Sequence, residues 1–247
     1  MKILLLADIH GNSPALSAIA DFFGAEHFDH IINCGDSLVY APFPNEILHW
    51  LEEHRTISIL GNTDKKVIRL LQGKTLHKPG KEEKRLMYTS TAGQLDERAA
   101  RYLCSLPINA SLRVSLPGGD ERNTIRTIGI FHGSPAEPHE LLFADTPDER
   151  FRELTSHCEC QVIVTGHSHT PYHKLIAGTH FINPGSAGRM FDGDPRACCA
   201  VLQLTAESVQ LEHFRISYDI EMLSQALTDG QFPEIYARMF REGRKLN

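Results

Sequence analysis

The chain has 247 residues, of which 41% are hydrophobic and 23% charged, and its formal net charge at pH 7 is −6. This composition is typical of a folded globular protein with a substantial core. The acidic balance argues against nucleic acid as a partner, because binding to its backbone needs a basic surface. No apolar run reaches the length of a membrane span, so we expect no membrane partner.

The cysteines and the N-terminus suggest a compartment. The apolar stretch at residues 1–7 is too short for a signal peptide and is followed at once by Asp8. The cysteines form no CxxC pair and no pattern typical of a disulfide framework. We therefore expect a cytoplasmic protein with reduced cysteines. They are Cys34, Cys104, Cys158, Cys160, Cys198 and Cys199.

The first 72 residues alternate between strand and helix patterns. Apolar runs predict strands at 2–7, 30–34 and 56–60. A first helix is predicted to start with Ser13 as its cap, followed by Pro14, and further helices are predicted at 45–54 and 65–72. Thr63 or Asp64 is expected to cap the third helix, after a turn at Gly61. This alternation predicts right-handed crossovers and a parallel sheet core.

Residues 73–107 interrupt that alternation. They begin with a basic stretch broken by proline and glycine, and a helix is predicted at 95–106. The lysines fit a solvated surface. The functional alternative is that residues 73–107 form a helical cap insertion whose lysines help to hold an anionic substrate.

The rest of the chain is rich in predicted strands. A hairpin is expected around Ala206–Glu207. Together with the first part of the chain, these strands predict one domain, residues 1–247, with two packed sheets flanked by helices. The strands are predicted at 110–116, 124–131, 160–165, 172–176, 179–183, 197–205 and 208–217.

Polar residues that can bind metals follow five of the predicted strands. Because the carboxyl ends of parallel strands share one crevice, we expect these side chains to lie together, with adjacent glycines allowing close approach. They are Asp8 and His10, Asp36, Asn62, His132, and His167 with His169.

Each of these residues alone is more typical of a helix cap or a hydrogen-bonded loop residue. The combination instead predicts a metal site built from nitrogen and oxygen ligands, which suits Mn, Fe, Zn or Ni. Other chemistries fit poorly, because the chain lacks a GxxxxGK[ST] loop and a GxGxxG motif after a strand. Ser168 lacks the closing glycine of a nucleophile elbow and is interpreted as a spacer between two histidines.

In this order, the motifs DIHGN, GD, GN, HGSP, GHSHTP and NPGSAG resemble the calcineurin-like metallophosphoesterase superfamily, in particular its small bacterial and archaeal phosphodiesterase branch. The match extends from Asp8 to about Arg196. It implies an α/β fold in the form of a four-layer αββα sandwich, with two mixed sheets flanked by helices.

The resemblance also implies a pair of divalent metal ions, with manganese expected. The ligands would be Asp8, His10 and His169 for one ion, Asn62, His132 and His167 for the other, and Asp36 as the bridge. Two such ions share a hydroxide that can attack phosphorus at neutral pH, so Asp36 and Asn62 would act in catalysis through the metals. The implied activity is hydrolysis of phosphodiesters or phosphoanhydrides.

Thr63 departs from the family pattern, in which many members have a histidine that protonates the leaving group. A hydroxyl cannot replace imidazole as a general acid near pH 7. The general acid is therefore unknown, and we expect substrates with good leaving groups, such as activated aryl diesters or nucleoside polyphosphates. His139 could donate the proton, although it is more simply interpreted as a surface residue.

Four further residues are candidates for contact with a small phosphate-ester substrate, namely Asn12, Tyr40, Ser186 and Arg189. The alternatives are a non-catalytic interaction module on the same scaffold, as the resemblance to a retromer subunit would allow, and a phosphoprotein phosphatase or nuclease of the same family. All seven ligand positions are intact, which favours an enzyme. Whether the protein is a homo-oligomer stays open.

Overall fold

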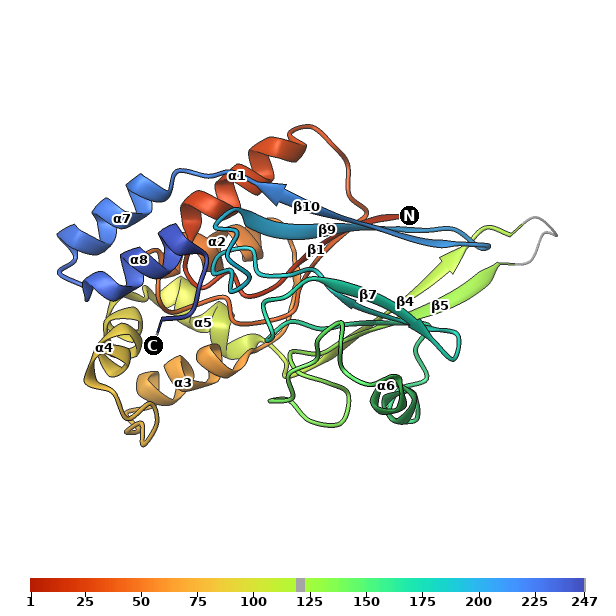
Figure 1. Cartoon of the computed structure of the whole chain (residues 1–247), viewed down its shortest axis with the longest axis horizontal. Helices are drawn as coiled ribbons and strands as arrows, with labels where there is room; N and C mark the ends of the chain where they lie inside the picture. The colour runs from red at the N-terminus through yellow and green to blue at the C-terminus, as the bar shows by residue number, and fades with distance from the viewer. Residues whose placement is uncertain (119–122, 247) are drawn as a thin grey trace.

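The protein is an αββα sandwich, described by a computed structural model over residues 1–118 and 123–246. Two five-stranded mixed sheets form the inner layers, with helices on the outer face of each (Figure 1). This arrangement confirms the fold class expected from the sequence.

The first sheet has the strand order β10-β9-β1-β2-β3. Its three N-terminal strands are parallel and are joined by two helices, α1 (Ser13–Phe23) and α2 (Pro44–Glu53), as the alternating pattern predicts. The hairpin expected around Ala206–Glu207 is confirmed, because β9 and β10 pair in antiparallel orientation. The strands are β1 (Lys2–Leu6), β2 (His30–Asn33), β3 (Ile57–Ser58), β9 (Ala197–Leu204) and β10 (Val209–Ile216).

The second sheet has the order β4-β5-β6-β8-β7. β5, β6 and β8 are parallel to one another, while β4 and β7 pair in antiparallel orientation at the two edges. The strands are β4 (Ala110–Leu116), β5 (Thr124–Ile130), β6 (Val162–Val164), β7 (Tyr172–Ile176) and β8 (Thr179–Asn183).

Central strands such as β1, β6 and β9 are buried on both faces, as expected where a sheet is covered on both sides, whereas the edge strands β4, β7 and β10 keep exposed residues. Ile3 and Leu5 of β1 point into the core between the sheets, whereas Leu4, between them, packs on the helices. On β6, Val162 faces the core between the sheets and Ile163 faces the opposite side. The alternation of side chains along each strand thus builds three apolar layers.

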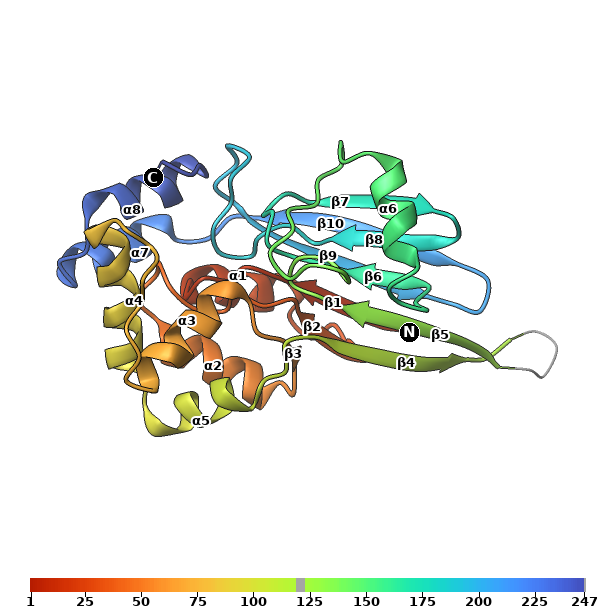
Figure 2. The same cartoon turned by 90° about the horizontal axis from the view of Figure 1, so that it is seen from below.

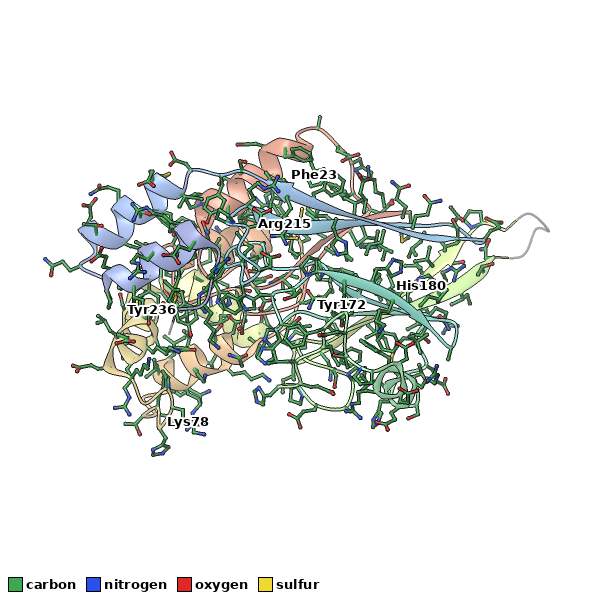
Figure 3. The ribbon with its side chains drawn as sticks, in the orientation of Figure 1. Phe23, Lys78, Tyr172, His180, Arg215 and Tyr236 are labelled. Atoms are coloured by element: carbon green, nitrogen blue, oxygen red, sulfur yellow. A yellow bond between two sulfur atoms is a disulfide. The ribbon has the colours of Figure 1, made fainter. Side chains whose placement is uncertain are left out.

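Most helices gather on the first sheet, and within the described residues α6 (Asp148–Thr155) is the one helix that lies across the second (Figure 2). Phe151 of α6 packs edge to face on Phe181 and on Tyr172, which lies among the strands in Figure 3. The remaining helices are α3 (Asn62–Leu71), α4 (Glu82–Gln94), α5 (Glu97–Ser105), α7 (Ile220–Asp229) and α8 (Glu234–Glu242).

The sequence did not predict α4, α6, α7 or α8. α4 has a weak apolar stripe, in which Met87, Tyr88 and Thr91 are buried, and it packs against α3. Tertiary contacts therefore stabilise this helix more than its own pattern does. Segment 73–107 thus holds two helices, but its role as a cap insertion and the single-domain assignment stay predictions.

α1 begins at Ser13 as expected, but the residues that cap α1 and α3 differ from those expected. Asn12, not Ser13, caps α1, because its Oδ1 accepts a hydrogen bond from the Ala15 N–H at 3.1 Å. α3 begins at Asn62, after Gly61, so neither Thr63 nor Asp64 is its cap. Instead the Asp64 carboxylate accepts the Gly61 N–H at 2.9 Å.

The expectation that all six cysteines are reduced is wrong for one pair. Cys158 and Cys160 form a disulfide, whereas Cys34, Cys104, Cys198 and Cys199 are free. None of the helices in the described part of the chain combines the length and the apolarity needed to cross a bilayer. The predicted cytoplasmic location stays a prediction.

The core between the sheets predicts a clear difference between two leucine substitutions. Leu5 is fully buried there, so Leu5→Ala should destabilise the protein by about 2–5 kcal/mol through lost burial and a cavity. Leu175 is 59% exposed, and Leu175→Ala should change the free energy of unfolding by less than about 0.5 kcal/mol. Urea unfolding of both variants measures the difference, and equal effects would contradict this assignment of the core.

Candidate metal centre

The polar residues after β1, β2, β3, β5 and β6 converge, although they come from two different sheets. His132 follows β5 of the second sheet, and its Nε2 lies 3.5 Å from Oδ1 of Asp36, which follows β2 of the first. The expectation that these strand ends share one crevice is confirmed.

One cluster consists of Asp8, His10 and His169, all buried, with candidate ligand atoms within 4.8 Å of one another. The Nε2 atoms of His10 and His169 are 3.3 Å apart, and the His169 Nε2 is 3.5 Å from Oδ1 of Asp8. The second oxygen of Asp8 accepts the backbone N–H of His167 at 2.9 Å.

The second cluster consists of Asp36, His132 and His167, within the same 4.8 Å limit. Asn62 joins it, because its Oδ1 lies 3.3 Å from the His132 Nε2. His167 is the most open of these imidazoles and is half-buried at the wall of a cavity.

Asp36 lies between the two clusters. Its Oδ1 faces His132, while its Oδ2 lies 3.9 Å from the His10 Nε2. The Thr63 N–H donates to Oδ1 at 2.8 Å and holds the carboxylate in this orientation. One carboxylate thus presents an oxygen to each cluster.

Hydrogen bonds to the backbone fix the orientation of three imidazoles. The Nδ1–H groups of His10, His169 and His132 donate to the carbonyl oxygens of Leu38, Arg189 and Cys34, respectively. In the neutral tautomer that results, the Nε2 atoms of His10 and His169 carry lone pairs that face their cluster. The Nε2 of His132 faces the Asp36 carboxylate.

This arrangement brings acceptors together without donors between them. The lone pairs of His10 and His169 face each other, and Oδ1 of Asp8 is buried without a hydrogen-bond partner. Buried acceptors that face one another are costly unless a cation lies between them. The residues present therefore fit a pair of divalent ions, with nitrogen and oxygen ligands and no thiolate.

The pKa shifts agree with this reading. Burial lowers the pKa of His10 to about 3 and that of His167 to about 4, so both are neutral near pH 7. Burial opposes a charge on His132 as well, but the adjacent Asp36 carboxylate outweighs it and raises the pKa of His132 to about 9. Positive charge is thus favoured beside Asp36.

The backbone is strained where these side chains are held. Asp8, His10, Asp36, His167 and His169 all have positive φ angles, between 51° and 66°. This left-handed region is sparsely populated by residues other than glycine and costs about 1–3 kcal/mol for each. Strain concentrated in this way is typical of a functional site.

Glycines allow the loops to approach closely. A Cβ added to Gly61 would overlap Oδ1 and the backbone nitrogen of Asp36, and one added to Gly166 would lie 3.0 Å from Oδ2 of Asp8. Gly35 has a φ of +90°, and its Cβ would lie 2.6 Å from the Gly61 nitrogen. These glycines are therefore required for close packing around the carboxylates.

Thr63 and Asp64 brace the loop that carries Asp36. The Thr63 hydroxyl donates to the Leu38 carbonyl at 3.1 Å, the same oxygen that accepts from His10. Asp64 accepts the Ser37 N–H at 3.2 Å and the Leu38 N–H at 3.1 Å. The hydroxyl proton of Thr63 is therefore already engaged within the protein.

Two of the four substrate-contact candidates are held inside the fold. Asn12 is fully buried, caps α1 and donates to the Gly188 carbonyl at 2.8 Å. The Ser186 hydroxyl donates to the Asp8 carbonyl at 2.7 Å and accepts the Arg189 N–H at 2.7 Å. Both side chains are thus engaged within the protein, and their contact with substrate stays a prediction.

Tyr40 and Arg189 line a cavity of about 570 Å³ that opens onto both clusters. The Arg189 guanidinium carbon lies 3.8 Å from the centre of the Tyr40 ring. His139 is exposed, and its ring centre is 6.4 Å from that of His167.

Sequence reasoning missed several residues that line this cavity, namely Lys84, Leu141, Phe143, Phe191 and Lys245. Lys84 belongs to the basic stretch that was interpreted mainly as solvated surface. The others carry no motif, and only the packing of distant segments places them here.

The two sheets and the paired His/Asp clusters define a metallophosphoesterase architecture. The chain belongs to the calcineurin-like phosphoesterase superfamily, because the family model of the calcineurin-like phosphoesterase superfamily domain matches residues 1–207.

The chain is similar to several archaeal and bacterial proteins along nearly its whole length. It is 27% identical to the uncharacterized protein MJ0912 of Methanocaldococcus jannaschii over 252 residues, covering 94% of each chain. A metallophosphoesterase crystal structure from Sphaerobacter thermophilus is 25% identical, with a TM-score of 0.78 and coverage of 98% of this chain and 100% of that one. The hypothetical protein PH1004 from Pyrococcus horikoshii shares the fold, with 19% identity, a TM-score of 0.83 and 99% coverage of both chains.

The close approach of Gly61 to Asp36 predicts the effect of a single methyl group. Gly61→Ala should displace the Asp36 carboxylate and weaken divalent-metal binding by about 10- to 100-fold, as is typical when the support of a ligand is lost. Titration of the metal-free protein with Mn²⁺ measures this effect. Gly93→Ala is the control, because a Cβ there meets nothing within 4 Å, and equal affinities for the two variants would refute the packing argument.

Proposed function

We propose that this protein is a two-metal-dependent phosphoesterase that hydrolyses phosphodiesters or phosphoanhydrides. The observation that carries the proposal is the carboxylate of Asp36, whose oxygens face two adjacent sets of metal-binding side chains at the wall of one cavity. Membership of the superfamily supports the same activity.

The proposed ligands divide as the two clusters do. Asp8, His10 and His169 hold one ion, Asn62, His132 and His167 hold the other, and Asp36 bridges them. When bound, two such ions supply an activated water at neutral pH and positive charge for the phosphoryl oxygens. We propose manganese, although iron, zinc or nickel would suit the same ligands.

The protein itself contributes orientation and charge. The backbone carbonyls that accept from the histidine Nδ1–H groups keep each Nε2 directed at its ion. Arg189 is proposed to bind a phosphate oxygen of the substrate from the cavity wall, because guanidinium matches phosphate geometry, and Tyr40 positions that guanidinium.

Thr63 is proposed to position Asp36 rather than to donate a proton. Its hydroxyl is buried and donates to the Leu38 carbonyl, and its N–H holds the Asp36 carboxylate. The departing group therefore leaves without a proton from this position, which favours substrates whose leaving groups are weak bases.

Removing the bridging carboxylate should abolish activity. Asp36→Ala removes the anionic ligand that both ions would share. Turnover of bis(p-nitrophenyl) phosphate with Mn²⁺ should therefore fall by more than about 100-fold, because losing a residue that only supports a ligand already costs up to about 100-fold. Elemental analysis of the same samples should show less bound metal. Asp21→Asn, on the exposed face of α1, is the control. Unchanged turnover by Asp36→Ala would show that the bridging assignment is wrong.

The absence of a general acid at Thr63 predicts a strong dependence on the leaving group. General acid catalysis is typically worth about 10²–10⁴-fold. Unactivated alkyl esters should therefore react more slowly than aryl diesters, and this difference in rate should be larger than in relatives that have histidine at this position. A substrate panel with leaving groups of graded pKa measures this slope.

His139→Ala is the matched test of the one nearby histidine that could donate a proton. The exposed position of His139 predicts a small effect, well below the roughly 100-fold expected for loss of a general acid. A large loss confined to alkyl esters would identify His139 as the acid. Metal-loaded protein with no turnover of any substrate would favour the non-catalytic module.

A further inference from the structure

Three cationic side chains from distant segments line the cavity beside the metal-binding clusters. Lys84 comes from α4, Arg189 from the loop after β8, and Lys245 from the segment after α8. Among the described residues, no carboxylate lies within ion-pair distance of any of the three. Their charge is therefore not neutralised within the described part of the protein.

Arg189 is the most deeply held of the three. It is only 5% exposed, its guanidinium carbon lies 3.8 Å from the Tyr40 ring centre and 5.0 Å from that of Phe191, and its Nε has no hydrogen-bond partner. One terminal nitrogen contacts the sulfur of Met239 at 3.2 Å. The aromatic rings stabilise the guanidinium in part, but a buried cation without an anionic partner still carries a desolvation cost that a bound anion would offset.

The two lysines add to the same charged wall. The Gly193 N–H donates to the Gly243 carbonyl at 2.9 Å, which fastens the segment that carries Lys245 to the loop that carries Arg189. The Lys245 Nζ lies 5.9 Å from the Phe191 ring centre. Partial burial and repulsion from Lys245 and Arg189 lower the pKa of Lys84, as expected for like charges held close together.

This wall carries more charge than a simple phosphodiester needs. Two divalent ions, the carboxylates of Asp8 and Asp36 and the hydroxide that the ions would share leave a charge of about +1, which already balances the single negative charge of a diester. Three further cations call for a substrate with additional anionic groups next to the scissile one. Leu141, which is 50% exposed, and Phe143 line the same cavity and offer apolar contact for an organic group.

We infer that Lys84, Arg189 and Lys245 form a second anion subsite, which binds the phosphate that departs when a phosphoanhydride is cleaved. The substrate class is then an organic polyphosphate of the nucleoside polyphosphate type. This inference rests on the proposed function and deepens it.

The subsite also accounts for the missing proton donor. In hydrolysis, the oxygen of water bonds to one phosphorus, and the bridging P–O bond breaks with its electron pair on the departing phosphate. The proton of the water is released to solvent. Cations around the departing phosphate stabilise the charge that develops on it, so this leaving group needs no proton from Thr63.

The kinetic test compares two substrates with the metal-loaded protein. Lys84→Ala and Lys245→Ala should each lower kcat/KM for diadenosine tetraphosphate by about 10-fold, and the double variant by more, since each removes a charged contact to phosphate. Turnover of bis(p-nitrophenyl) phosphate, which has no second phosphate, should stay within about threefold of the value for the unmodified protein. A change of this size is smaller than the loss expected from removing one charged contact to phosphate. Lys74→Ala is the matched control, because Lys74 is exposed and its side-chain Nζ donates to the side chain of Gln72, away from the residues that line the cavity.

A binding test is independent of catalysis. Calorimetry should show that inorganic tripolyphosphate binds the metal-free protein and the Lys74→Ala variant, and binds the double lysine variant at least about 10-fold more weakly. Equal binding by all three, or equal kinetic losses with both substrates, would overturn the second subsite while leaving the proposed function intact. Absence of turnover with both substrates would instead refute the proposed function, and the binding result would still decide the subsite.

Discussion

The site depends on one unfavourable interaction, the burial of several hydrogen-bond acceptors that face each other. The Nε2 lone pairs of His10 and His169 are 3.3 Å apart, and Oδ1 of Asp8 beside them has no partner. Carbonyl oxygens of Leu38 and Arg189 keep both rings in this orientation. Such an arrangement costs free energy in the protein alone and becomes favourable when cations are bound. The affinity for metal and the strain of the site thus have the same origin.

The two-sheet architecture can sustain this cost because its core is large and lies directly beneath the site. The loops that follow the strand ends have left-handed backbone conformations at five of the candidate ligands, and they pack closely at glycines such as Gly61 and Gly35. Part of the stability supplied by the apolar layers is therefore offset by strain at the strand ends. Substitutions that only loosen the core would reach the site through these loops.

The loop after β8 joins the two halves of the proposed mechanism. Its Ser186 hydroxyl anchors the loop to the Asp8 carbonyl, its Arg189 carbonyl orients His169, and the Arg189 guanidinium projects to the cavity between Tyr40 and Phe191. A single short segment thus orients a candidate ligand and carries a buried cation. Figure 3 shows Tyr236 of α8 at the side of the molecule where Figure 1 places α4 and α7. Lys84 of α4 and Lys245, which follows α8, line the cavity.

The sequence by itself determined the strands, the parallel core and the convergence of seven polar residues, because these follow from local apolar runs and from what stands at their ends. It could not determine α4, whose apolar stripe is weak and whose stability comes from packing, or that Asn12 and Ser186 have structural contacts. α8 was missed although its apolar residues recur at helical spacing. The proximity of Lys84, Arg189 and Lys245 was decided by tertiary structure alone, since these residues are separated by about a hundred and by fifty-six positions in the chain. Chemistry at strand ends is encoded locally, whereas a cavity wall built from three distant segments exists only after the chain has folded.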